Sequence, residues 1–212
     1  MVGEDVVSKH NVNIYGSGDR TIIFAHGLGL DQTTWRLVAP AFQEQFKIVL
    51  LDHIGCGKSD KSAFNVKKYS NLEGYADDVN ALCEHLQLKD VVFVAHSISS
   101  MIALIAALKR PVLYDKFVFI GPSPRYLNDV DGYVGGHQSA DVESIIKEIE
   151  EDCISWIQNT IPTVAGESNP SYLVREIMNS FISTDTEMLK QFALTTFFID
   201  YRKDLLRFNK SC

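Results

Sequence analysis

The feature that most constrains the fold is the alternation of short apolar runs with helical patterns along the first part of the chain. Runs rich in β-branched and aromatic residues predict four buried strands: Thr21–Ala25, Phe46–Leu51, Val91–Ala95 and Lys116–Ile120. An antiparallel partner for the first of them is predicted at Val12–Tyr15. Between the strands, periodicity predicts three helices: Thr34–Gln45, Asn71–Leu86 and Ile98–Lys109. This order is typical of an α/β fold with a mostly parallel sheet flanked by helices.

The pattern changes after Gly121, where strand-like runs give way to helical ones. Periodicity and helix-start residues predict five further helices: Asp141–Glu151, Cys153–Ile161, Pro170–Phe181, Thr186–Phe198 and a short one at Lys203–Phe208. Pro162 is expected to end the second, because proline lacks the N–H that a helix interior uses. A sheet-and-helix portion, residues 1–121, is thus followed by a helical portion, residues 122–208.

Length and composition exclude several classes of function. The 212 residues suit one domain, and the longest apolar run, Met101–Leu108, is too short to cross a membrane. The first residues, Met1-Val-Gly-Glu-Asp, do not predict a secretion signal, and 20 basic against 27 acidic residues disfavour nucleic-acid binding. The four cysteines are far apart and form no metal-binding motif. We therefore expect a cytoplasmic protein without metal, cofactor, membrane or nucleic-acid partner.

A candidate nucleophile lies directly between a predicted strand and a predicted helix. Ser97 is the centre of Ala95-His96-Ser97-Ile98-Ser99, whose outer residues are small enough for a tight strand-to-helix turn. Such a turn lifts the serine hydroxyl above the edge of the sheet, as in the G-x-S-x-G pattern. Serine is also a favoured helix N-cap, so the pentapeptide by itself leaves both interpretations open.

A loop with two glycines follows the predicted strand Thr21–Ala25. The sequence His26-Gly27-Leu28-Gly29 can turn backbone N–H groups toward the nucleophile. Acyl transfer needs two such donors aimed at the developing oxyanion, and each lowers the barrier by about 3 kcal/mol. The amides of Leu28 and Ile98 are the predicted pair, whereas the His26 side chain is interpreted as structural.

A third loop contains Gly57-Lys58-Ser59 and so resembles the end of a phosphate-binding loop. A true phosphate-binding loop would need glycine at the position of Asp52 and a helix that begins at Ser59. The sequence continues with loop-like residues instead. Nucleotide binding is therefore rejected.

The three loops, in this order, resemble the α/β-hydrolase superfamily. The similarity becomes closer through Trp35, the sequence Tyr-Ala-Asp-Asp at residues 75–78, the sequence Pro-Arg-Tyr-Leu-Asn-Asp at residues 124–129, and Gly135-Gly136. These features are similar to the branch that holds the bacterial stress-response regulator RsbQ and the plant karrikin and strigolactone receptors. In that branch, as here at Ser99, serine also occurs where other hydrolases have glycine.

The resemblance implies three parts: an α/β-hydrolase core over residues 1–121, a helical lid over 122–198, and the start of a return to the core over 199–212. It also implies an apolar pocket for a small ligand between core and lid. The predicted lining is mostly aromatic and comprises Leu28, Tyr126, His137, Trp156, Phe181, Phe192 and Phe197. For each aromatic residue of the lid, packing within the lid is an equally open alternative.

The family pattern also requires an acid and then a histidine after the lid. Residues 209–212 stand where the next strand is expected to begin, so we expect a chain truncated before both residues. The only histidine after Ser97 is His137, which Asp129 and Asp131 precede in the same loop. A triad improvised from these residues is disfavoured, because they do not lie on two separate strand ends.

Three functions stay open at this point. The first is a serine hydrolase of the RsbQ type that cleaves a small hydrophobic ester or lactone, with Ser97 as nucleophile. The second is a non-catalytic sensor of such a ligand whose lid binds a partner protein, which in RsbQ-like proteins is a PAS-domain phosphatase of a stress response. The third is an inactive truncated remnant. Catalysis by the chain itself is expected to be weak, because nothing is positioned to deprotonate Ser97.

Overall fold

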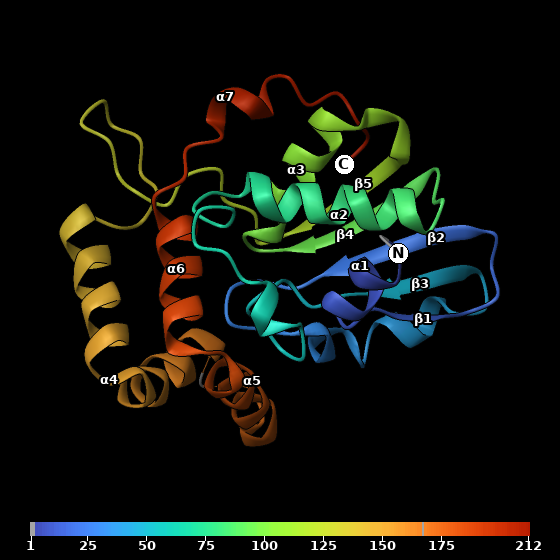
Figure 1. The fold of residues 1–212 in the computed structure, drawn as a ribbon. Helices are drawn as coiled ribbons and strands as arrows, with labels where there is room; N and C mark the ends of the chain where they lie inside the picture. Colours follow the sequence, from blue (N-terminus) through green and yellow to red (C-terminus); the bar gives the residue numbers. More distant parts are fainter. Residues whose placement is uncertain (1–2, 167) are drawn as a thin grey trace.

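A five-stranded sheet in the order β1-β3-β2-β4-β5 organises the molecule (Figure 1). The computed structural model describes residues 3–166 and 168–212. Its strands are β1 (Asn13–Tyr15), β2 (Arg20–Ala25), β3 (Phe46–Leu50), β4 (Val91–His96) and β5 (Tyr114–Ile120). The last four are parallel to one another and β1 is antiparallel to its neighbour, which confirms the predicted mostly parallel sheet.

The position of β1 differs from the prediction. It pairs with β3, with Asn13 opposite Leu50 and Tyr15 opposite Ile48, and not with β2. The reason is that β2 lies inside the sheet with β3 on one side and β4 on the other, so both of its hydrogen-bonding edges are occupied. Only the outer edge of β3 is left for the first strand.

Side chains alternate between two apolar layers along the central strands. In β2, Ile23 faces the main core beneath α2 (Glu73–His85) and α3 (Ser99–Lys109). The next residue, Phe24, faces the opposite layer, where its ring centroid lies 5.1 Å from that of Trp35. A strand buried on both faces reads as a continuous apolar run, which is why β2, β3 and β4 are found where predicted. The strand β5 is also found, but its predicted burial is wrong on one face: as the last strand of the sheet it leaves Val118 45% and Ile120 43% exposed.

The predicted helix over Thr34–Gln45 is wrong. Two short 3-10 turns replace it, η1 (Gln32–Trp35) and η2 (Ala39–Phe42). Pro40 would stand in the middle of the predicted helix, where it would remove a backbone hydrogen bond and clash with the preceding turn. At the first turn of η2 the missing N–H costs nothing.

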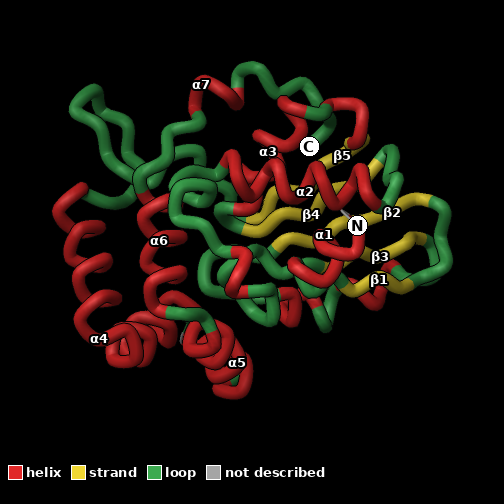
Figure 2. The backbone as a smooth tube through the Cα atoms, in the orientation of Figure 1, coloured by secondary structure: helices red, strands yellow, loops and turns green. Residues whose placement is uncertain are grey.

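The helical portion lies beyond the carboxyl ends of the parallel strands, as Figures 1 and 2 show. It comprises α4 (Ser139–Ala165), α5 (Ser171–Ser183) and α6 (Thr186–Phe197), and the short α7 (Arg202–Leu205) follows. The helix α1 (Gly3–Lys9) at the other end of the chain was not predicted. We refer to α4, α5 and α6 together as the helical segment.

Within α4, the predicted break is present and the predicted end is not. Asp152 has non-helical backbone angles, and its carboxylate accepts hydrogen bonds from the amide and hydroxyl of Ser155 at 3.0 and 2.7 Å. Pro162, in contrast, lies inside the helix, which continues to Ala165. A proline one turn from the end removes only the bond to the Gln158 carbonyl, so the helix tolerates it.

Two short elements complete the core. They are η3 (Lys61–Ala63) and η4 (Pro111–Leu113). At the edge of the sheet, the Phe117 amide donates to the Ser211 carbonyl at 2.9 Å, and Lys116 and Ser211 form a parallel bridge. The last residues therefore run alongside β5.

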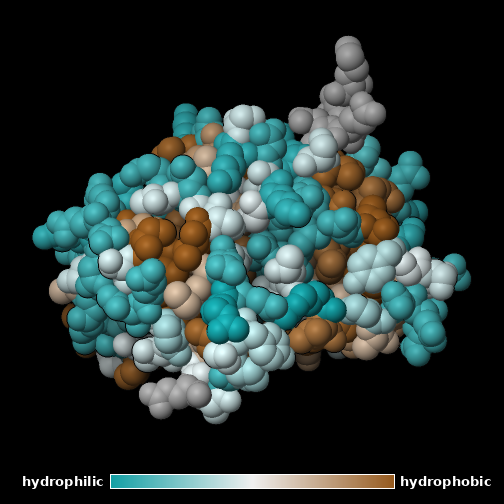
Figure 3. Space-filling view, turned by 90° about the horizontal axis from the view of Figure 1, so that it is seen from below, coloured by the Kyte–Doolittle hydropathy of each residue, from teal (hydrophilic) through white to brown (hydrophobic). Residues whose placement is uncertain are grey.

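Hydrophobic side chains on the face seen in Figure 3 form separate patches among hydrophilic ones. No helix in the described part of the chain is both long and apolar enough to cross a membrane. The described residues also contain no group of three or more histidine, cysteine, aspartate or glutamate side chains that is placed to hold a metal ion.

Candidate active site

Ser97 lies on a sharp turn between β4 and α3. Its backbone has φ +55°, in the left-handed region that costs a residue with a side chain about 1–2 kcal/mol. The Ser97 amide donates to the Ile120 carbonyl at 2.8 Å, which ties the turn to the end of β5. The helix begins at Ser99 with no side-chain cap, so the hydroxyl of Ser97 is not used as an N-cap.

The partner of the Ser97 hydroxyl among the described residues is the Tyr126 hydroxyl, at 3.5 Å. Burial raises the pKa of Tyr126, so this phenol keeps its proton and can donate a hydrogen bond. The Tyr126 ring lies edge-to-face on Phe197, with centroids 5.7 Å apart, and Phe197 in turn contacts His137. Three of the predicted pocket residues thus gather beside Ser97.

The loop after β2 approaches the same turn closely. A Cβ atom added to Gly27 would lie 3.1 Å from the Cβ of Ser97 and 2.9 Å from Nδ1 of His96. Within the described chain, the amides of Leu28 and Ile98 donate no hydrogen bond to another residue. Both predicted oxyanion donors are therefore unpaired next to the hydroxyl that they would serve.

A buried hydrogen-bond network fixes this loop in place. Nε2 of His53 lies 2.8 Å from the Ser99 hydroxyl, which in turn donates to the His26 carbonyl. The His53 amide donates to Nε2 of His26 at 3.0 Å, and Nδ1 of His26 donates to the Gly27 carbonyl at 2.8 Å. Ser99, which is fully buried, thus joins the start of α3 to the loops after β2 and β3.

Both histidines of the network are neutral structural groups. Burial lowers the pKa of His26, and burial together with the neighbouring histidines lowers the pKa of His53 well below 6.5. Neither ring contacts the Ser97 hydroxyl. The role of His53 was missed in the sequence, although its place directly after a buried strand put it at the same edge of the sheet as Ser97.

The improvised triad is not assembled. The Asp129 carboxylate binds Arg125 at 2.5 Å and Arg202 at 2.7 Å, and the contact of the His137 ring is with Phe197. Among the residues that the structure describes, neither a carboxylate nor an imidazole is hydrogen-bonded to the Ser97 hydroxyl.

The other predicted aromatic residues of the pocket lie in two apolar clusters. Phe192 is buried in the main core, where its ring stacks on Tyr75 at 4.7 Å. Trp156 and Phe181 are buried in a separate cluster of the helical segment, with ring centroids 6.0 Å apart. Phe181 packs directly on Gly29, so this cluster contacts the loop that carries Leu28.

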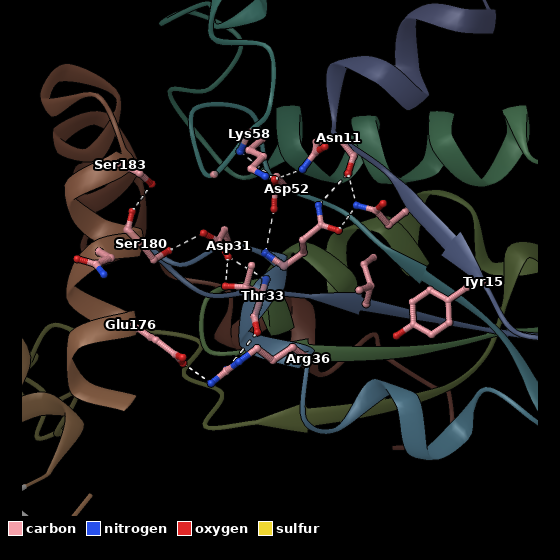
Figure 4. Close-up of a pocket in the computed structure, with 15 residues that line it drawn as sticks. Asn11, Tyr15, Asp31, Thr33, Arg36, Asp52, Lys58, Glu176, Ser180 and Ser183 are labelled. Atoms are coloured by element: carbon pink, nitrogen blue, oxygen red, sulfur yellow. Dashed lines mark hydrogen bonds and ion pairs between the residues drawn. The ribbon is translucent and has the colours of Figure 1, made fainter. Parts of the chain in front are cut away.

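A recess of about 830 Å³ lies between η1 and α5 (Figure 4). Its polar groups already pair across it: Ser180 donates to Asp31 at 3.2 Å, and Arg36 forms an ion pair with Glu176. The Asp52 carboxylate accepts hydrogen bonds from one side-chain amide and two backbone amides. Since these polar groups are already paired with one another, we interpret the recess as part of the packing interface between α5 and the core.

Several known proteins are similar to this chain. Residues 20–142 match the model of a family described as alpha/beta hydrolase fold. A solved structure of a hydrolase from Oleispira antarctica has a TM-score of 0.94 and 40% identity, and the match covers 98% of this chain and 76% of that one. A karrikin insensitive 2 receptor of Petunia hybrida is 36% identical over 94% of this chain and 72% of its own length. A strigolactone esterase of Pisum sativum is 32% identical over 100% of this chain and 79% of its own length.

Proposed function

The chain belongs to the α/β-hydrolase fold family, and we propose that it is a serine hydrolase that acts on a small hydrophobic ester or lactone. It is related to strigolactone esterases and karrikin receptors. One observation carries the proposal. Ser97 stands on a strand-to-helix turn at φ +55°, next to two unpaired backbone amides.

In the proposed reaction the Ser97 oxygen attacks the ester carbonyl and forms a C–O bond. The amides of Leu28 and Ile98 bind the oxyanion that develops, where each donor contributes about 3 kcal/mol of barrier lowering. Collapse of the tetrahedral intermediate breaks the bond to the alcohol or enol, which takes up the Ser97 proton by way of water, and leaves an acyl group on Ser97. Water then releases the acid and restores the hydroxyl.

Proton removal from Ser97 limits the proposed rate. A serine hydroxyl is a weak nucleophile unless an adjacent base takes its proton, and no described residue does so. Sites without a working triad still accelerate acyl transfer by about 10³–10⁴-fold over water, through the oxyanion donors and binding. We therefore propose slow turnover for the chain itself, with α4, α5 and α6 as a lid over the site.

The test is covalent labelling by a fluorophosphonate probe, followed by peptide mapping. We expect the label on Ser97, its loss in Ser97→Ala, and its retention in Ser100→Ala, since Ser100 is a buried serine in the first turn of α3. Hydrolysis of p-nitrophenyl acetate should be weak and unchanged in His137→Ala. No label on the folded chain, or a label that persists in Ser97→Ala, would contradict the proposal.

A ligand receptor is the second candidate, supported by the identity to the karrikin insensitive 2 receptor. In this role the aromatic group of Tyr126, Phe197 and His137 would hold a small hydrophobic ligand without turnover. Ligand binding that survives Ser97→Ala, and that changes capture of a partner protein, would favour it. The RsbQ type, the stress-response role and the PAS-domain phosphatase rest on the sequence resemblance and stay predictions.

A further inference from the structure

Four charged side chains form a closed ring where the helical segment joins the core. Arg125 binds Asp129 at 2.5 Å and Asp200 at 3.4 Å. Arg202 binds Asp129 at 2.7 Å and holds Asp200 through two bonds of 2.8 and 2.6 Å. Charges alternate around the ring, and each carboxylate touches both guanidinium groups. We call these four residues the clasp.

The clasp joins the two stretches of chain that connect the helical segment to the core. Arg125 and Asp129 lie on the stretch that leaves β5, and Asp200 and Arg202 lie on the stretch that returns from α6. A backbone bond from the Tyr201 amide to the Pro124 carbonyl, at 2.8 Å, crosses between them at the same level. The stretch that leaves β5 and the stretch that returns from α6 are therefore bonded directly to each other.

A loop, residues 127–137, leaves the clasp and closes on itself; we call it the bridged loop. Leu127 and His137 form a parallel bridge at its ends, and the Asn128 amide donates to the His137 carbonyl at 2.8 Å. Tyr133, within this loop, lies under the Arg202 guanidinium at 4.6 Å and donates its hydroxyl to the Arg125 carbonyl at 3.3 Å. The bridged loop therefore contacts the same charged groups.

Tyr126 is held between these fixed points. Its neighbour Arg125 belongs to the clasp, and its own carbonyl accepts the His137 amide at 3.1 Å. Its ring rests on Phe197, three residues before the returning half of the clasp. Its hydroxyl is the group that lies 3.5 Å from the Ser97 hydroxyl.

The two halves of the ring differ in exposure. The side chains of Arg125 and Asp129 are 18% exposed, and those of Arg202 and Asp200 are 34% and 39% exposed. Partly buried pairs are screened by salt less than exposed ones. The hydrogen bonds from Arg202 lower the pKa of Asp200 to about 2, so this carboxylate stays charged at neutral pH.

We propose that the clasp positions Tyr126 over Ser97, so that the four charged residues control the reactivity of the nucleophile from outside the site. The proposal rests on the proposed function only in using Ser97 reactivity as one of its two readouts. In this view Arg202 and Asp200 are positioning residues, and Tyr126 is the group through which they act.

The experiment compares Arg202→Gln with Arg207→Gln. Arg207, like Arg202, pairs with an aspartate, in its case Asp204 of α7 at 3.1 Å, but its side chain is 68% exposed and it belongs to neither the bridged loop nor the clasp. The first readout is the rate of Ser97 labelling by a fluorophosphonate, measured in Arg202→Gln, Tyr126→Phe and the double variant. The second is the ¹⁹F resonance of Tyr126 in protein made with fluorotyrosine, assigned by its loss in Tyr126→Phe.

We expect Arg202→Gln to slow labelling by roughly threefold or more, the range in which residues of one network couple. Arg207→Gln should label like the parent, and the double variant should label like Tyr126→Phe alone. Arg202→Gln should also move the Tyr126 resonance, which a mere loss of stability would not do in the folded protein. Unchanged labelling and an unmoved resonance would overturn the proposal, and so would full additivity in the double variant.

Failure of the proposed function is separable from failure of the clasp. If the parent protein is not labelled, Ser97 is not a reactive nucleophile, and the ¹⁹F resonance alone decides whether Arg202 positions Tyr126. If Arg202→Gln does not fold, Arg202→Lys takes its place. Lysine keeps the positive charge but cannot form the paired hydrogen bonds that the guanidinium donates to Asp200. The same outcomes then support or overturn the proposal.

Discussion

Ser99→Ala tests the buried network that holds the loop after β2. The hydroxyl is completely buried, accepts a hydrogen bond from His53 and donates one to the His26 carbonyl. Its removal leaves the His53 ring without an acceptor and the His26 carbonyl without this donor. Each buried group left unpaired lowers the free energy of unfolding by about 1–3 kcal/mol. With partial relaxation we expect the free energy of unfolding to fall by about 2–4 kcal/mol.

Ser100→Ala is the matched control. The Ser100 hydroxyl is equally buried on the same helix, but it makes a single bond, to the Ala95 carbonyl at 3.1 Å. Its loss should cost about 1 kcal/mol. Urea unfolding followed by circular dichroism measures both variants against the parent chain. Equal losses for Ser99→Ala and Ser100→Ala would refute the inference that Ser99 joins two loops.

Two further predictions concern the same region. Acid should destabilise the fold, because His26 and His53 have pKa values below 6.5 in the folded protein. Below pH 6.5 the unfolded chain therefore binds more protons than the folded one. The free energy of unfolding then falls by up to about 1.4 kcal/mol per pH unit for each ring. Urea unfolding between about pH 7.5 and pH 5 checks this, and a flat profile would contradict it. Gly29→Ala should cost more stability than Gly132→Ala, since both have positive φ but only a Cβ at Gly29 would meet the Phe181 ring, at 2.2–2.4 Å. Thermal unfolding compares the stability of the two variants. Equal decreases in the melting temperature would mean that the Phe181 ring moves away from the added methyl group without a stability cost.

The local pattern of the sequence was enough to predict most strands of the sheet and to place Ser97 between a strand and a helix. Strands buried on both faces appear as short apolar runs. A sequence of the pattern small-x-Ser-x-small after such a run favours a tight strand-to-helix turn. The break of α4 at Asp152 was also predicted, and in the structure the Asp152 carboxylate accepts a hydrogen bond from the amide of Ser155, three residues later. In these cases the deciding contacts join residues that are near one another along the chain.

Other features depend on which segments the sheet brings together. The strand β1 pairs with β3 because β2 has no free edge, and no residue of β1 encodes that. Ser99 meets His53 across 46 positions because two parallel strands end at the same edge. The clasp joins Arg125 to Asp200 across 75 positions, although each residue in isolation resembles an ordinary surface charge. Side-chain periodicity determines which face of an element is buried, but only the order of the strands decides which distant residues share that face.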